Sequence, residues 1–484
     1  MKFEVSDSSV AQVVILPVFV EDLPKLSNDG KTVRKDRLLP HVGARHGVTW
    51  INAPAEDEPD LLILGMGEEA KFKPYMMQEA AGNASRALQK EQRSSAVVTF
   101  EALGSRKILS GCMPAVIAAW VEGSLLGTYS FHKYKSSVAE QAETTIIFKS
   151  TAGAAWKEAI RVGQIRAEGT MWARDLTNEP PNGLRPRDLA ERTAERFAGT
   201  KAQVAIYEEP DLEHLGFAGL TAVGRGSIHP PVFIEVRYCT DETKPLIALI
   251  GKGVTFDTGG ISLKRDNDIS DMRMDMAGAA AVLGALDILV RSGAEANVAV
   301  LVPSAENSPS DRALLPGEVI RYANGVTVQV GNTDSEGRLI LADALIYAHR
   351  IGAKQAIDLA TLTYSVVGAL GSKVAAVLGD DELADALQTS GEPSGERLWQ
   401  MPLVDEYEAY MHSDYADACN ISSVGEAGVI TSSLFLRKFV HPSLKWTHID
   451  MNGPKESASC TGEFAVGATG FGARMLAHYV TNLS

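Results

Sequence analysis

A lysine and an aspartate occupy a glycine-rich stretch in the middle of the sequence. Lys252 and Asp257 lie in GKGVTFDTGG, which directly follows an apolar run at residues 246–250. Because binding sites in α/β sheets gather at the carboxyl ends of strands, both side chains are candidates for chemistry. Lys264 and Asp275 follow, and Asp275 precedes small residues that begin a predicted helix and leave room for something beside it.

A second charged stretch, NTDSEGR at residues 332–338, also follows a predicted strand and precedes a predicted helix. Asp334 and Glu336 are two residues apart, so their side chains point the same way if this segment is extended. Arg338 lies at the helix start, where exposed backbone amides and the helix dipole favour an anion. The stretch therefore combines two acids with an anion-binding position.

Each of these residues has an ordinary structural explanation when it is taken alone. Lys252 and Asp257 can form a loop ion pair, since such pairs are often only structural. Asp275 can cap a helix. Asp334 can pair with Arg338 at a helix start. Their joint occurrence at strand ends is what indicates a site.

The charge of the acidic residues supports a metal site. Together, four carboxylates carry −4, which is unfavourable in one pocket without compensating cations. Two divalent ions balance this charge, and carboxylate oxygens suit Zn, Mn, Mg or Co at a paired site with a spacing of about 3.5 to 4 Å. A lysine beside the ions can serve as a nitrogen ligand once it is deprotonated. The four acids are Asp257, Asp275, Asp334 and Glu336.

The elements that must position these residues are alternating strands and helices. Strand-like runs recur at residues 204–207, 232–238, 246–250, 298–302, 326–330 and 356–359, with helical patterns at 276–291 and 339–350. Such βα repeats predict a mixed, largely parallel sheet with helices on both faces. The first 150 residues show a similar alternation, with strands predicted at 13–20, 61–64 and 96–100 and a helix at 78–92.

A helical stretch at residues 161–175 ends near Pro180 and Pro181, which stop a helix. These features suggest a boundary region, and we place the domain border near residue 165. The predicted domains are an N-terminal α/β domain at residues 1–165 and a catalytic domain at residues 166–484.

Four stretches make the sequence similar to the leucyl (cytosol) aminopeptidase family. They are KGVTFDTGG, ISLK, MDMAG and NTDSEGRL, which begin at residues 252, 261, 274 and 332. The resemblance covers nearly the whole chain, weakly up to about residue 160 and strongly from 170 to 375. It implies a metallo-exopeptidase that removes an apolar, Leu-like residue from the free N-terminus of peptides. It also implies a small macro-like N-terminal domain, a larger catalytic domain and a homohexamer.

The same resemblance assigns roles to individual residues. One divalent ion, Zn or Mn, is expected at Lys252, Asp257, Asp275 and Glu336, and a second at Asp257, Asp334 and Glu336. Lys264 matches the lysine that stabilises the developing oxyanion, and Arg338 matches the arginine that holds a bicarbonate acting as general base. The segments that contact substrate contain Met272, Thr361 and Leu362.

The sequence departs from the family pattern near this substrate pocket. Tyr364 and Ser365 stand where Gly-Ala is usual, and residues 452–455 read NGPK in place of a stretch like Ala-Gly-Thr-Ala. The preference for the first residue of the substrate therefore cannot be read from the family.

Composition restricts the partners and the location. A net charge of −15 and a pI near 5.2 disfavour nucleic acid or an anionic membrane as principal ligand, because phosphate binding needs surplus Lys and Arg. The first apolar run is too short and too late for a signal peptide, and no run reaches the roughly 18 apolar residues of a membrane helix. Four scattered cysteines suit a reducing cytosol, so we predict a cytoplasmic protein. A DNA-binding assembly role, known for some family members, stays open as an added function.

One alternative is a nucleotide-dependent oxidoreductase. Gly65-Met66-Gly67 follows a predicted strand and precedes a helical pattern, as a dinucleotide fingerprint does. However, Glu68 and Glu69 would repel a pyrophosphate. The acid that would contact the ribose, Glu101, lies 36 residues beyond Gly65 rather than about 20 after the motif.

Overall fold

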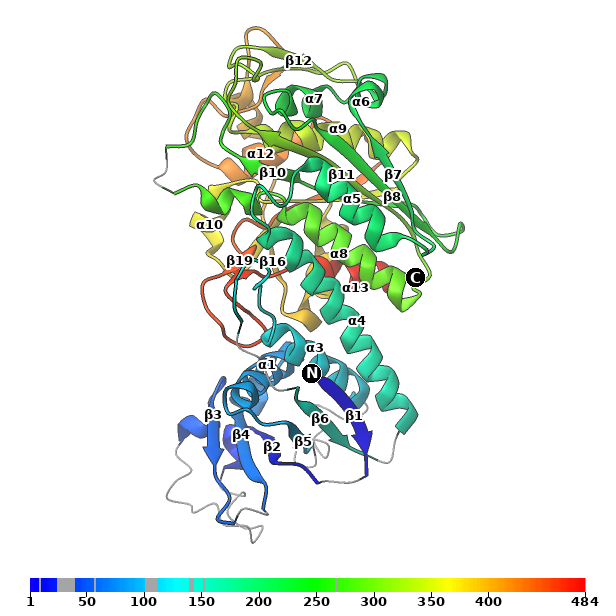
Figure 1. Cartoon of the computed structure of the whole chain (residues 1–484). Helices are drawn as coiled ribbons and strands as arrows, with labels where there is room; N and C mark the ends of the chain where they lie inside the picture. Colours follow the sequence, from blue (N-terminus) through cyan, green and yellow to red (C-terminus); the bar gives the residue numbers. More distant parts are fainter. Residues whose placement is uncertain are drawn as a thin grey trace. The chain divides into compact units, whose positions relative to one another are not determined.

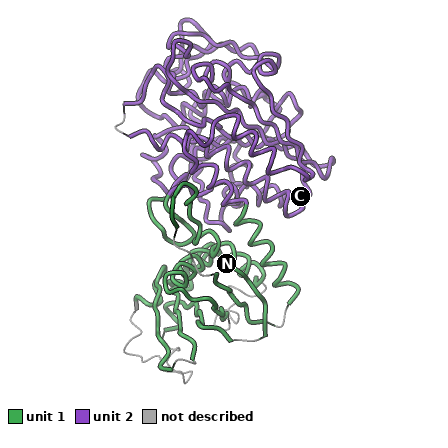
Figure 2. The backbone as a smooth tube through the Cα atoms, viewed as in Figure 1, with its two compact units in different colours: residues 1–168, 457–466 green, residues 169–456, 467–484 purple. Residues whose placement is uncertain are grey.

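The computed structural model describes residues 1–7, 10–23, 40–55, 58–100, 112–138, 143–150, 153–265 and 268–483. These residues fold as two compact α/β units (Figure 2). The first comprises residues 1–168 and 457–466, and the second comprises residues 169–456 and 467–484. The predicted class, a smaller N-terminal α/β part and a larger α/β part with a mixed sheet, is confirmed.

The first unit is built on a six-stranded sheet in the order β1-β6-β5-β2-β4-β3 (Figure 1). Its pairings are parallel except that of β3 with β4. Helices α1 and α3 pack against each other, and Trp120 of α3 is fully buried in the core of this unit. The elements are β1 (Lys2–Ser6), β2 (Val13–Val18), β3 (Val48–Ile51), β4 (Asp60–Gly65), α1 (Tyr75–Lys90), β5 (Ser95–Val98), α3 (Met113–Gly127) and β6 (Thr145–Lys149).

The second unit contains a nine-stranded sheet among the described residues, in the order β16-β15-β18-β14-β9-β11-β8-β7, with β10 beside β11. Its middle strands β18, β14, β9 and β11 run parallel to one another. Strand β15 pairs antiparallel with β18 and parallel with β16, β8 pairs antiparallel with β11, and β7 pairs antiparallel with β8. The strands are β7 (Gln203–Tyr207), β8 (Val232–Cys239), β9 (Ile247–Gly251), β10 (Gly253–Asp257), β11 (Asn297–Asn307), β14 (Gln355–Ala360), β15 (Val374–Gly379), β16 (Arg397–Gln400) and β18 (Lys445–Asp450).

Helices lie on both faces of this sheet (Figure 1). Helices α7, α9 and α12 share one core with β9 and β11, while α8 and α13 pack together and α8 contacts β9 and β14. The helices of this unit are α5 (Pro186–Phe197), α6 (Glu209–Leu215), α7 (Ala218–Gly224), α8 (Ala277–Ser292), α9 (Glu336–Arg350), α10 (Tyr364–Leu370), α11 (Asp381–Gly391), α12 (Gly428–Arg437) and α13 (Ala473–Thr481). Helix α4 (Gly153–Asn178) has residues in both units. A small sheet joins β12 (Val319–Arg321), β13 (Thr327–Gln329) and β17 (Ala418–Cys419).

Glycines allow α8 to approach the sheet closely. A Cβ added to Gly251 would lie 2.5 Å from the Cα of Ala279, and one added to Gly278 would lie 2.1 Å from the carbonyl oxygen of Leu359. The sequence predicted that the small residues at the start of α8 leave room beside the helix. They do, and the backbone of β9 and β14 fills that room. This packing brings the start of α8 to the carboxyl ends of the parallel strands, where a site is expected.

The predicted strands and helices around both charged stretches are present, with two differences. Residues 253–257 form β10 beside β11. Asp334 lies in a turn before α9, so the segment is not extended, and the condition under which Asp334 and Glu336 would point the same way is not met. Within the part of the chain that the structure describes, no helix is long and apolar enough to cross a membrane.

Candidate active site

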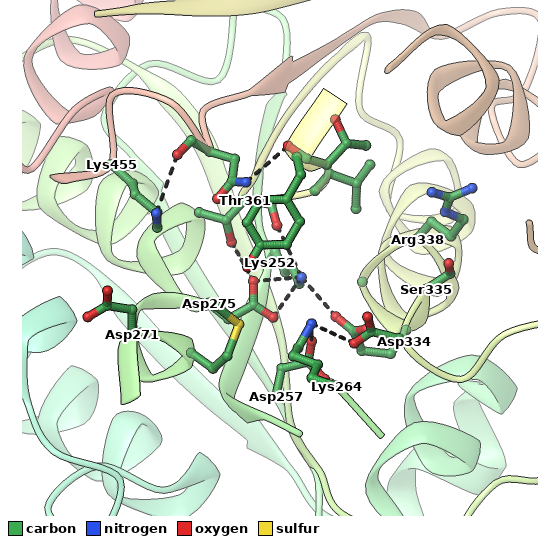
Figure 3. A pocket seen from close by; sticks show the side chains of 17 residues that line it. Lys252, Asp257, Lys264, Asp271, Asp275, Asp334, Ser335, Arg338, Thr361 and Lys455 are labelled. Carbon is green, nitrogen blue, oxygen red and sulfur yellow. Dashed lines mark hydrogen bonds and ion pairs between the residues drawn. The ribbon is translucent and has the colours of Figure 1, made fainter. Parts of the chain in front are cut away.

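Two lysines and four acids converge at the carboxyl edge of the central strands (Figure 3). The parallel strands end together at this edge, so residues distant in sequence become neighbours. Lys252 links β9 to β10, Asp257 ends β10, and Lys264 lies in the loop that follows. The remaining acids come from the approaches to two helices: Asp275 precedes α8, Asp334 precedes α9, and Glu336 is the first residue of α9.

Lys252 lies between two of the acids. Its Nζ lies 2.8 Å from Oδ1 of Asp275 and 2.8 Å from Oε1 of Glu336, and it donates a weaker 3.3 Å bond to the carbonyl oxygen of Thr361. The side chain reaches this position because residue 337 is glycine: a Cβ there would lie 2.6 Å from the Cε of Lys252. Thr361 also donates a 2.7 Å hydrogen bond to Oδ1 of Asp275, which fixes that carboxylate.

Lys264 joins the other two acids. Its Nζ lies 2.8 Å from Oδ2 of Asp257 and 2.5 Å from Oδ1 of Asp334. The other oxygen of Asp257 accepts hydrogen bonds of 2.8 Å from the backbone N–H of Gly259 and from the side-chain amide of Asn307. Asp257 is therefore held from both sides.

The pKa values of these groups reflect burial and crowding of like charge. Burial and the Asp257 carboxylate raise the pKa of Glu336 to about 7, and the same two causes raise the pKa of Asp334 to about 7. Burial lowers the pKa of Lys252, but the carboxylates of Asp275 and Glu336 more than offset this and raise it overall. The site therefore carries more negative charge than its own lysines compensate.

The donor set fits divalent metal ions. Asp257, Asp334 and Glu336 each offer a carboxylate oxygen, and these oxygens lie within 4.8 Å of one another. Oε2 of Glu336 is buried and accepts no hydrogen bond from the residues that the structure describes. An unpaired buried carboxylate oxygen is costly, and a cation beside it would remove that cost. Hard oxygen donors of this kind suit Zn, Mn or Mg.

Arg338 occupies the side of the site away from Asp275 (Figure 3). Its Nη1 donates a 2.8 Å hydrogen bond to the carbonyl oxygen of Asn420, and its guanidinium lies over the ring of Phe435 at 5.9 Å. Burial lowers the pKa of Arg338 to about 10. The side chain of Asn420 bonds the backbone of Gly331 and Asn332 at 2.8 and 2.7 Å, so this one residue fixes both the acidic turn and the arginine.

A model of the catalytic domain of the cytosol aminopeptidase family matches residues 171–477, and a model of the family's N-terminal domain matches residues 43–138. The chain belongs to the cytosol aminopeptidase family. Aminopeptidase activity follows from this membership.

Individual relatives agree with the family match. The chain is 39% identical over 428 residues to a probable cytosol aminopeptidase of Chlorobium limicola, covering 86% of this chain and 84% of the relative. It is 35% identical to that of Gloeobacter violaceus, covering 98% and 92%. Among solved structures, the bottromycin maturation enzyme BotP in complex with Mn superposes with a TM-score of 0.87 at 32% identity, covering 98% of this chain and 99% of that one.

All ten residues that the sequence assigned to this aminopeptidase site line one cavity. Lys252, Asp257, Lys264, Asp275, Asp334, Glu336 and Arg338 surround it together with the proposed substrate contacts Met272, Thr361 and Leu362. Their individual roles, like the hexamer, stay predictions.

Sequence reasoning missed several residues that support or line this site. Asn307 and Asn420 hold site residues through contacts that only the fold provides. Residues 452–455 stand out in the sequence as a departure near the substrate pocket, but no local pattern gives Asn452 or Lys455 a role there. Asn307 lies at the end of β11, the same kind of position that drew attention to Asp257. This position at a strand end is a signal that could have pointed to Asn307 as a site residue.

The backbone amides of Gly65-Met66-Gly67, in the first unit, are already hydrogen-bonded to other parts of the backbone. The N–H groups of Gly65, Met66 and Gly67 donate to the carbonyl oxygens of Gly47, Val18 and Gly43 at 2.8–2.9 Å. A pyrophosphate needs free amides at such a loop, so the dinucleotide interpretation loses its physical basis. Glu101, the acid it required, lies outside the described residues.

Proposed function

We propose that this chain is a two-metal aminopeptidase that releases the first residue of peptides with a free α-amine. The observation that carries the proposal is the convergence of four acids with a buried Glu336 oxygen that accepts no hydrogen bond from the described residues. One ion would be held by Lys252, Asp257, Asp275 and Glu336, and the other by Asp257, Asp334 and Glu336. Bound divalent ions would polarise the scissile carbonyl and make an attacking water more acidic.

Lys252 can join this ligand set only as a neutral amine. The neighbouring carboxylates raise its pKa, so the proton must leave when a cation takes over the charge compensation. The same exchange would relieve the repulsion that raises the pKa of Glu336.

The chain's own residues would position the substrate. Asp275, oriented by Thr361, would pair with the substrate's α-amine. Lys264, whose ammonium group lies beside Asp257 and Asp334, would donate a hydrogen bond to the substrate's carbonyl oxygen as that oxygen becomes negatively charged. Arg338 would hold an anion such as bicarbonate, which accepts a proton during the reaction. Its Nε is buried and donates to none of the described residues, which supports an anion there.

The first side chain of the substrate would lie against Met272, whose thioether lines the cavity. Such a contact favours apolar residues such as Leu and Met. This preference concerns the wall of the pocket that Met272 forms.

Metal removal tests the proposal directly. Dialysis of the full chain against a chelator should abolish hydrolysis of leucine amide, and Zn, Mn or Co should restore it. Glu336→Gln should bind fewer than two ions per chain by elemental analysis, whereas Glu382→Gln, an exposed glutamate 84% accessible, should bind as the wild type does. Full activity in a verified metal-free sample would contradict the proposal.

A further inference from the structure

The central cavity opens into two larger hollows. The space between the carboxylates is about 70 Å³. A hollow of about 580 Å³ adjoins it past Ser335 and Arg338, and another of about 600 Å³ adjoins it past Lys455 and Asp271. Lys455 and Asp271 lie on the side of the cavity opposite Ser335 and Arg338 (Figure 3).

The direction of a bound peptide follows from the proposed function, on which this inference rests. With the α-amine at Asp275 and the carbonyl oxygen at Lys264, the leaving peptide continues past Asp334 toward Arg338 and the 580 Å³ hollow. The first side chain leaves the α-carbon next to the amine. It therefore extends toward the wall that contains Met272, Asn452 and Lys455.

The backbone around Lys455 is fixed. Its N–H donates to the carbonyl oxygen of Met451 at 3.1 Å, and its carbonyl oxygen accepts a 3.0 Å bond from Thr469. The side-chain amide of Asn452 donates a 3.0 Å bond to the carbonyl oxygen of Thr363. The lysine side chain is only 12% exposed. Lys455 is thus a built part of the wall.

The ammonium group of Lys455 keeps donor capacity for a ligand. Its Nζ lies 2.7 Å from Oε1 of Glu456 and 3.5 Å from the carbonyl oxygen of Asn452. An ammonium has three N–H donors, and the second of these contacts is at the limit of a hydrogen bond. The neighbouring Glu456 competes for the ammonium but is itself 36% exposed.

We propose that Lys455 is a specificity-determining residue that binds an oxygen acceptor at the end of the substrate's first side chain. Gln and Glu have this chemistry: a two-methylene stem that packs against Met272 and a terminal amide or carboxylate oxygen that accepts from the lysine. The pocket would therefore accept substrates whose first residue is Gln or Glu as well as those that begin with Leu or Met.

The test uses the full chain loaded with Mn and the amides of Leu, Gln and Glu as probes. Lys455→Met should lower the kcat/KM ratios of Gln to Leu and of Glu to Leu by about tenfold, the size expected when a hydrogen bond from a charged donor is lost. Glu456→Gln removes the competing carboxylate and should raise the Glu to Leu ratio. Lys445→Met makes the same change at the start of β18, the strand that leads into this wall, and should leave both ratios as in the wild type.

Three results would count against the inference. Ratios in Lys455→Met within twofold of the wild type, with leucine amide still hydrolysed, would overturn the role of Lys455 alone. A lower Glu to Leu ratio in Glu456→Gln would also overturn it, and this variant serves if Lys455→Met fails to fold. A wild-type enzyme that hydrolyses no aminoacyl amide with metal would overturn the proposed function and this inference with it.

Discussion

The side-chain amide of Asn307 donates a 2.8 Å hydrogen bond to Oδ1 of Asp257, and both residues are buried. The same amide group bonds the carbonyl oxygen of Thr333 at 3.0 Å, in the turn that carries Asp334. Asn307 therefore ties together the two strand ends that supply the acids. This is the geometry of a residue that does not bind a metal itself but orients a proposed metal ligand, here Asp257.

Replacing this amide should weaken metal binding. Asn307→Leu keeps a similar volume but removes both hydrogen bonds, so Asp257 loses its fixed orientation. Metal affinity is expected to fall by about 10- to 100-fold, the usual cost of losing such a partner. Titration of the metal-free chain with Mn measures it.

Asn297→Leu is the matched control, because Asn297 lies at the other end of the same strand and bonds the carbonyl oxygen of Lys244. It should bind Mn as the wild type does. Equal Mn affinity in Asn307→Leu would mean that Asp257 needs no orienting partner.

Lys264 is expected to act on the transition state. Lys264→Ala should lower kcat by about 10²- to 10³-fold, which is typical for loss of a donor to a developing oxyanion. The variant should still bind two ions, because its four acids remain in place. Loss of the ions together with Lys264, seen by elemental analysis, would assign the lysine to the metal site instead.

A blocked α-amine should prevent turnover. Acetylation removes the charge that would pair with Asp275, and leaving a buried carboxylate without a partner costs several kcal/mol. We expect kcat/KM for N-acetyl-leucine amide to be about a hundredfold or more below that for leucine amide. Comparable rates on the two amides would exclude an aminopeptidase site of this design.

A buried histidine should make stability depend on pH. Nδ1 of His448 lies 2.5 Å from Oδ1 of Asp358, and both side chains are fully buried. Burial lowers the pKa of His448, but the Asp358 carboxylate more than offsets this, so the pKa is raised above 6.5. The folded state therefore binds this proton more tightly than the unfolded state does. The stabilisation is fully present below pH 6.5 and is lost as the pH rises through the folded-state pKa.

Urea denaturation of the wild type and of His448→Gln measures this effect. The difference in their free energies of unfolding should shrink as the pH rises from about 6 to about 9. His214→Gln, a change at an exposed histidine of α6, should leave the pH dependence of the wild type intact. A difference between wild type and His448→Gln that stays constant with pH would refute the protonated pair.

The sequence by itself determined the family, the fold class and ten of the residues that line the cavity. Lys252, Asp257 and Glu336 were readable because each lies beside a strong local pattern, a buried strand or a helix start, and such patterns depend mainly on neighbours in the chain. Their shared charge then required one common site.

Only the tertiary structure decided which distant residues complete that site. Asn307, Asn420 and Lys455 reach it because separate strands and loops end at one edge, and no local periodicity records such a meeting. The fold also decided that Gly65-Met66-Gly67 is no nucleotide loop, since its amides bond to backbone at residues 18, 43 and 47. Hydrogen-bond partners supplied from elsewhere in the chain are a property of three-dimensional packing, so a motif alone cannot reveal whether its amides are free.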